Sequence, residues 1–110
     1  MHISARRAGA TTIFDISGDI DFANSALVRQ SLLHEIQETR TPRVVVNLSQ
    51  VRYIDSSGVA SLVEGLKASR DRGSRFILFG LSTAVWEVLQ LSQLVKVFEI
   101  YENEEQAMTS

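Results

Sequence analysis

Hydrophobic residues in this chain follow either strand-like or helix-like patterns, and the strand-like ones come in five places. Residues 2–7 and 11–17 read as two strands joined by a short turn, and the second, TTIFDIS, alternates and is rich in β-branched residues. RVVVNL at 43–48 and FILF at 76–79 are continuous apolar runs, which are typical of strands covered on both faces. VFEIY at 97–101 alternates as a last strand. The pattern therefore predicts a hairpin followed by three further strands.

The first helix is expected between the second and third of these strands. Asn24 is a plausible N-cap, because a short polar side chain just before a helix can accept a free amide hydrogen. The helix should run to about Thr39, and Pro42 prevents any continuation. Its expected inward stripe is formed by Val28, Leu32 and Ile36.

Two more helices and a short one complete the predicted fold. From Ser56 onward the apolar residues recur at helical spacing, and Gly73 provides a natural stop. Ser82 can cap a third helix that runs to about Leu91, and a short helix is expected at 104–108. The order of elements predicts one α/β domain over 1–110, with a mixed, mostly parallel β-sheet, an N-terminal hairpin and about four helices packed against it.

Composition removes several classes of function. The 110 residues carry a net charge of −2 without a block of like charges, so the basic surface of a nucleic-acid-binding protein is missing. The absence of cysteine excludes disulfides, thiolate zinc sites and cysteine nucleophiles. The only histidines, His2 and His34, offer no convincing metal site or catalytic base, so no cofactor is expected. No apolar run is long enough to insert into a membrane, and we expect a cytoplasmic protein that is not an enzyme.

The stretch RYIDSSGVASL places Asp55, Ser56, Ser57 and Gly58 where a strand-like run gives way to a helix-like one. Serine and aspartate are ordinary N-caps, but one cap needs only one residue. At least one hydroxyl is therefore left over and is expected to face solvent. A phosphate on such a hydroxyl would be stabilised by the free amides and the helix dipole. The same phosphate would add about −1.5 to −2 charge and would disrupt a partner docked there.

The sequence around this junction resembles a known family. VVVNLSQVRYIDSSGVASL, followed by GSRFILFGLSTAVWEVLQLSQLVKVFEIYENEEQAM, is similar to the STAS domain and most closely to the bacterial anti-sigma-factor antagonists. DISGDIDFANS is similar to the segment between that family's second strand and first helix. The likeness covers nearly the whole chain. It departs from the common pattern only after Gly58, where Val59 and Ala60 stand in place of the frequent Leu-Gly.

The resemblance implies a phosphorylation switch. Ser56 corresponds to the family's phosphate acceptor, and Asp21 to its aspartate in the loop after the second strand. The implied partners are an anti-sigma factor with serine-kinase activity and a PP2C-type phosphatase, and the unphosphorylated chain would occupy the kinase and so free the sigma factor. The residues expected to bind the partner lie in the loop at 18–24 and the helix start at 56–66: Asp21, Phe22, Asn24, Asp55, Ser56, Ser57, Gly58 and Leu62.

Two alternatives stay open at this stage. STAS domains also occur as small subunits that brace the ATPase of lipid-transport (Mla-type) ABC transporter complexes, and such a subunit would keep the motif as a cap and contact surface. The role of Phe22 is the second open point. Its ring is either an aromatic anchor that binds a partner protein or a side chain that packs into the core. Trp86 is expected to be partly buried beside the inward stripe of the third helix.

Overall fold

The computed structural model describes residues 1–110 and contains a five-stranded sheet whose strands lie side by side in chain order. The first two strands pair antiparallel and each later strand pairs parallel to the one before it. This confirms the predicted mixed, mostly parallel sheet with an N-terminal hairpin. The strands are β1 (His2–Ala8), β2 (Thr11–Ser17), β3 (Arg43–Gln50), β4 (Arg75–Phe79) and β5 (Glu99–Tyr101).

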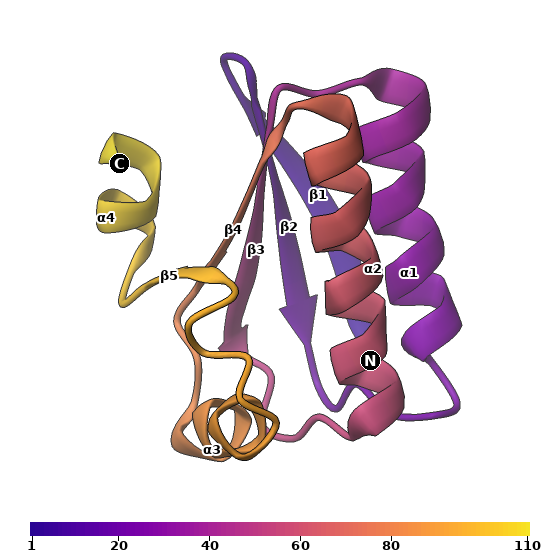
Figure 1. Ribbon diagram of the computed structural model, residues 1–110, viewed down its shortest axis with the longest axis vertical. Coiled ribbons are helices and arrows are strands. Elements are labelled where there is room, and N and C mark those ends of the chain that lie inside the picture. The colour runs from indigo at the N-terminus through magenta and orange to yellow at the C-terminus, as the bar shows by residue number, and fades with distance from the viewer.

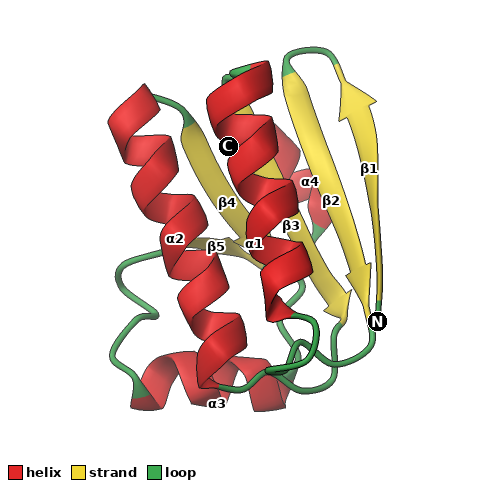
Figure 2. Ribbon diagram, turned by 90° about the vertical axis from the view of Figure 1, so that its right-hand side faces the viewer, coloured by secondary structure: helices red, strands yellow, loops and turns green.

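The helices form layers on both faces of the sheet. Two of them lie side by side across one face, a short C-terminal helix lies on the opposite face, and another lies across one end of the sheet (Figures 1 and 2). The predicted four helices are thus present. They are α1 (Ser25–Leu33) with a π-helical continuation η1 (His34–Thr39), α2 (Ser56–Arg72), α3 (Thr83–Leu91) and α4 (Glu104–Thr109).

The main core lies between the sheet and the pair α1 and α2. The predicted stripe of the first helix is fully buried, as is the apolar run of β3. Gly73 ends α2 in the left-handed conformation, with φ of 70°, as its position in the sequence predicted. A smaller apolar cluster fills the other side of the sheet beneath α4, and its members are Ile13, Val45, Ile77, Phe79 and Ala107.

Local structure departs from the sequence-based expectation at two elements. The first helix changes to π-helical geometry from His34, and its buried Glu35 accepts hydrogen bonds from Arg7, Thr12 and Thr41. The last strand is shorter than the predicted 97–101, because the amides of Val97 and Phe98 both bond back to the carbonyl of Leu94 in a turn. Neither change moves the junction between β3 and α2. No helix combines the length and the apolar character needed to cross a bilayer.

Candidate functional site

The loops that follow β2 and β3 meet at one end of the sheet. Because these strands are parallel, their carboxyl ends point the same way, and the loops emerge together beside the start of α2 (Figure 1). Backbone hydrogen bonds join the loops directly. The amide of Ile20 donates to the carbonyl of Tyr53 at 3.0 Å, and the amide of Asp55 donates to the carbonyl of Ile20 at 3.1 Å. The two segments therefore form one rigid surface.

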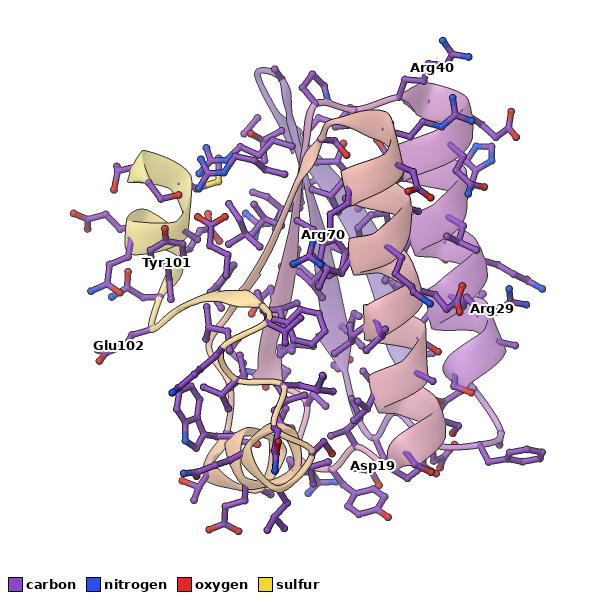
Figure 3. All side chains as sticks on the ribbon, in the orientation of Figure 1. Asp19, Arg29, Arg40, Arg70, Tyr101 and Glu102 are labelled. Atoms are coloured by element: carbon purple, nitrogen blue, oxygen red, sulfur yellow. The ribbon has the colours of Figure 1, made fainter.

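We call the surface formed by residues 18–24, 51–55 and the first turn of α2 the serine face. Asp19, in the first of these segments, lies at this end of the molecule near the beginning of α2 (Figure 3). Its backbone carbonyl accepts a hydrogen bond from the side-chain amide of Asn24 at 2.9 Å.

Asp55 is the N-cap of α2 and also ties the two loops together. One carboxylate oxygen accepts hydrogen bonds from the amides of Ser57 and Gly58, at 3.0 and 3.1 Å, and from the Ser57 hydroxyl at 2.5 Å. The other oxygen accepts from the amide of Phe22 at 3.0 Å. The Ser57 hydroxyl and then the Gly58 amide lower the pKa of Asp55 below its ordinary value, because these bonds favour the ionised form. Asp55 therefore stays ionised at neutral pH.

The two serines of the motif have different surroundings. The Ser57 side chain is half-buried and is engaged by the Asp55 cap. The Ser56 side chain is exposed, and its hydroxyl makes no hydrogen bond within the chain, so it is accessible from solvent. The Ser57 hydroxyl thus has a structural role and the Ser56 hydroxyl is free. The sequence suggested this, because the motif has more polar residues than one helix cap needs.

Gly58 lets the start of α2 lie directly against the loop after β2. A β-carbon at this position would come within 2.6 Å of Ile54 Cγ1 and 2.8 Å of the Ile20 carbonyl oxygen. Ile20 and Ile54, which form an isolated parallel bridge, are themselves almost completely buried. Any larger residue would push the helix start away from the loop and displace Ser56 with it.

Asp21 and Asn24 shape the loop rather than contact Ser56. One carboxylate oxygen of Asp21 accepts a hydrogen bond from the amide of Ala23 at 3.0 Å, and no hydrogen bond joins Asp21 to Ser56. Asn24 sits at the N-cap position of α1, but its side chain accepts from the amide of Asp21 at 2.9 Å and caps no helical amide. The predicted N-cap position of Asn24 is therefore confirmed, but the expected side-chain cap is absent because the amide group closes the loop instead.

Two aromatic side chains are exposed on the serine face. Phe22 is 86% exposed, so the possibility that it packs into the core is excluded. Tyr53 is 51% exposed and was missed in the sequence, although its position inside the motif between Arg52 and Ile54 marks it as a loop residue. Exposed aromatic residues beside an accessible hydroxyl provide an apolar contact surface for a protein partner.

One residue predicted to bind a partner does not reach the surface. Leu62 is completely buried in the main core, so its inclusion was wrong. It lies on the same helical stripe as Val59 and Leu66, and that spacing already placed it on the inward face of α2. The other predicted residues all lie on or directly beneath the serine face.

The rest of the chemistry-bearing residues do not form a second centre of this kind. His2 and His34 are both exposed, the first in β1 and the second at the start of η1. No group of three or more histidine, aspartate or glutamate side chains is arranged to hold a metal ion.

Comparison with known proteins agrees with this arrangement. Residues 2–107 match the model of the STAS domain family. The anti-sigma F factor antagonist of Paenibacillus polymyxa is 29% identical over 97 residues, which cover 88% of this chain and 83% of the relative. The anti-sigma-B factor antagonist of Listeria monocytogenes is 30% identical over 77% of this chain and 74% of the relative.

The fold is also that of SpoIIAA, a cell fate determinant of Bacillus, in both of its forms. The unphosphorylated form gives a TM-score of 0.77 at 16% identity, over 98% of this chain and 94% of that one. The phosphorylated form gives the same TM-score at 20% identity, over 98% and 97% of the two chains. The match to the family model, the similar sequences and the shared fold all cover the same elements, and the chain therefore belongs to the STAS domain family.

Proposed function

We propose that this chain is an anti-sigma-factor antagonist that is switched by phosphorylation of Ser56. In the unphosphorylated state the serine face binds an anti-sigma factor that is also a serine kinase. The kinase transfers the γ-phosphoryl group of ATP to Ser56 Oγ, with release of ADP and the hydroxyl proton. The phosphorylated chain then leaves its partner, and a phosphatase of the PP2C type restores the hydroxyl by hydrolysis.

The observation that carries this proposal is the exposed hydroxyl of Ser56 at the start of a 17-residue helix. The attacking oxygen is accessible to a kinase, and the neighbouring Ser57 already holds the Asp55 cap. A phosphate on Ser56 would lie beside the positive end of the α2 dipole, which stabilises negative charge. Phosphorylation therefore leaves the fold intact and changes only the surface.

The serine face also explains why such a small chemical change affects binding. Phe22 and Tyr53 offer apolar area to a partner, and the Ser56 hydroxyl at the start of α2 is small enough to be covered in the complex. A phosphoryl group brings about −1.5 to −2 charge and a tightly held hydration shell. Burying the phosphoryl group against the partner would carry a large desolvation cost unless a basic side chain of the partner paired with it.

The relatives support an antagonist in particular. Both sequence relatives are named as antagonists of anti-sigma factors, and both span most of this chain. The unphosphorylated and phosphorylated forms of SpoIIAA match the fold of this chain equally well, which supports a switch that acts through its surface. No observation favours the alternative of a subunit that braces an ABC transporter ATPase.

The test is to incubate the purified chain with ATP and the anti-sigma kinase of the same genome, and then to locate phosphate by tandem mass spectrometry. We expect one phosphate, on Ser56. Ser56→Ala should accept none, whereas Ser57→Ala, a matched loss of one neighbouring hydroxyl, should still be modified at Ser56. Phosphate on Ser57 in the parent chain, or no phosphate at all, would overturn the proposal.

A further inference from the structure

A second feature of the surface lies away from the serine face, between α3, β5 and α4. It is a groove of about 640 Å³ with eight lining residues, six of them hydrophobic. We call it the β5 groove. Its walls include Trp86 from α3, Val95 from the following turn, Ile100 and Tyr101 from β5, and Glu102. Tyr101 and Glu102 lie beside α4 and apart from Asp19 of the serine face (Figure 3).

The strand that borders the groove has an open edge. β5 pairs with β4 on one side and with no strand on the other. The carbonyl of Tyr101 accepts from the amide of Gly80 at 3.2 Å, so Tyr101 directs its main-chain groups toward β4. Successive residues of a strand direct these groups to opposite edges, and Ile100 therefore presents its amide and carbonyl outward. An open edge of this kind can accept an added strand.

The side chains around this edge can hold an apolar group of a partner. Trp86 is 39% exposed, which agrees with the partial burial expected beside the inward stripe of α3, and its indole lines the groove. Val97, on the turn before β5, is 40% exposed. A large aliphatic or aromatic side chain would bury the faces of these residues.

The charge around the groove is one-sided. Residues 83–110 contain five glutamates and a single basic residue, Lys96. Two of the glutamates are neutralised by ion pairs, Glu99 with Arg75 and Glu104 with Arg6. The other three, Glu87, Glu102 and Glu105, make no ion pair, and of these Glu102 lines the groove itself, while the guanidinium of Arg43 is occupied by the carbonyls at the end of α4. A partner that docks here gains most from lysine or arginine residues.

We infer that the β5 groove binds an extended segment of another protein, which adds as a sixth strand beside β5. The segment carries a large apolar side chain that enters the groove between Trp86 and Ile100, with lysine or arginine residues on either side that face the free glutamates. Its main chain bonds with the amide and carbonyl of Ile100. The site gives the domain a second docking surface that does not include Ser56.

The test uses a synthetic peptide, acetyl-Lys-Lys-Val-Leu-Val-Thr-Lys-Lys-amide, titrated into the isotope-labelled chain and followed by nuclear magnetic resonance. We expect the shifts to concentrate on the Ile100 amide and the Trp86 indole. A second peptide with glutamate in place of every lysine should bind at least about tenfold more weakly.

Two substitutions separate the groove from general charge attraction. Glu102→Lys should weaken binding of the lysine peptide at least about fivefold, because it reverses the charge at the groove wall. Glu64→Lys changes the net charge equally but lies on the outer face of α2, and it should leave the affinity unchanged. Trp86→Ala should weaken binding by about tenfold without loss of fold.

The inference is overturned if the lysine peptide does not bind at millimolar concentration, if the two peptides bind equally, or if the shifts map to the serine face. Ser56→Ala serves to keep the two proposals apart, because it abolishes phosphorylation but should leave peptide binding unchanged. Failure of either proposal is thus visible without the other.

Discussion

At the scale of single residues, neighbouring polar side chains in the motif have different roles. Asp55 and Ser57 hold the helix start together, and Ser56 between them has no structural bond. The sequence predicted that one hydroxyl would be surplus, since three polar residues precede Gly58. It could not decide between the serines, because the choice depends on which hydroxyl reaches the cap, and residue type alone does not show that.

Phe22→Ala tests the contact surface on its own. The phenyl ring is 86% exposed, so its loss should change the free energy of unfolding by less than about 0.5 kcal/mol. If Phe22 is an anchor, binding to the anti-sigma kinase should weaken about tenfold or more. Leu91→Ala is the matched control, because Leu91 is also 86% exposed but lies at the end of α3. Calorimetric titration that shows equal affinity for the parent and both variants would remove Phe22 from the interface.

The charge of Asp55 predicts a pH dependence. Its pKa is lower in the folded chain than in the unfolded one, so the ionised carboxylate stabilises the fold above its ordinary pKa of about 4. This contribution is lost as the pH falls through the folded-state pKa. Asp55→Asn keeps a capping side chain but has no charge to lose. Urea unfolding should therefore show a larger stability difference between parent and variant at about pH 7 than at about pH 3. A difference that stays constant between the two pH values would contradict this role for the carboxylate.

At the scale of elements, the start of α2 must lie close to the loop after β2. Gly58→Ala should destabilise the chain by about 1–3 kcal/mol in urea unfolding, although the same change in an ordinary helix is stabilising. The reason is that the added carbon meets the carbonyl oxygen of Ile20, which belongs to the backbone and cannot rotate away.

Gly65→Ala is the control for this prediction within the same helix. The atoms nearest to its added carbon would belong to side chains, the ring of Phe76 at 2.9 Å and Leu32 at 3.2 Å, and a side chain can shift more easily than a backbone carbonyl. We expect a smaller loss of stability than for Gly58→Ala, and no change in phosphorylation of Ser56. If Gly58→Ala were as stable as the parent and equally well phosphorylated, close packing at the helix start would not matter for the site.

The elements were predicted well where a repeating pattern decides them. The helical spacing from Ser56 and the stop at Gly73 predicted α2, and the valine-rich run predicted β3. The departures lie where specific side-chain bonds decide. The Asn24 side chain bonds to Asp21 and Asp19 in its own loop instead of capping a helical amide, and the buried Glu35 lies in a π-helical segment that no spacing indicates. Leu62 is a different case, because its own spacing already placed it in the core.

At the scale of the whole molecule, the sheet topology brings the functional surface together. Loops that are more than 25 residues apart in the sequence meet because β2 and β3 are parallel and adjacent, and backbone bonds between Ile20, Tyr53 and Asp55 lock them in place. The β5 groove lies beside β5, at one edge of the same sheet. The same folded chain can therefore present the serine face, which phosphorylation changes, and the β5 groove, which phosphorylation of Ser56 leaves unchanged.

The most direct test of this account is the dissociation constant of the complex with the anti-sigma kinase, measured by calorimetric titration for the unmodified chain, the Ser56-phosphorylated chain and Ser56→Ala. The account predicts that phosphorylation weakens binding by about tenfold or more, while the circular dichroism spectrum stays the same and Ser56→Ala binds like the parent. Equal dissociation constants for the phosphorylated and unmodified chains would contradict it.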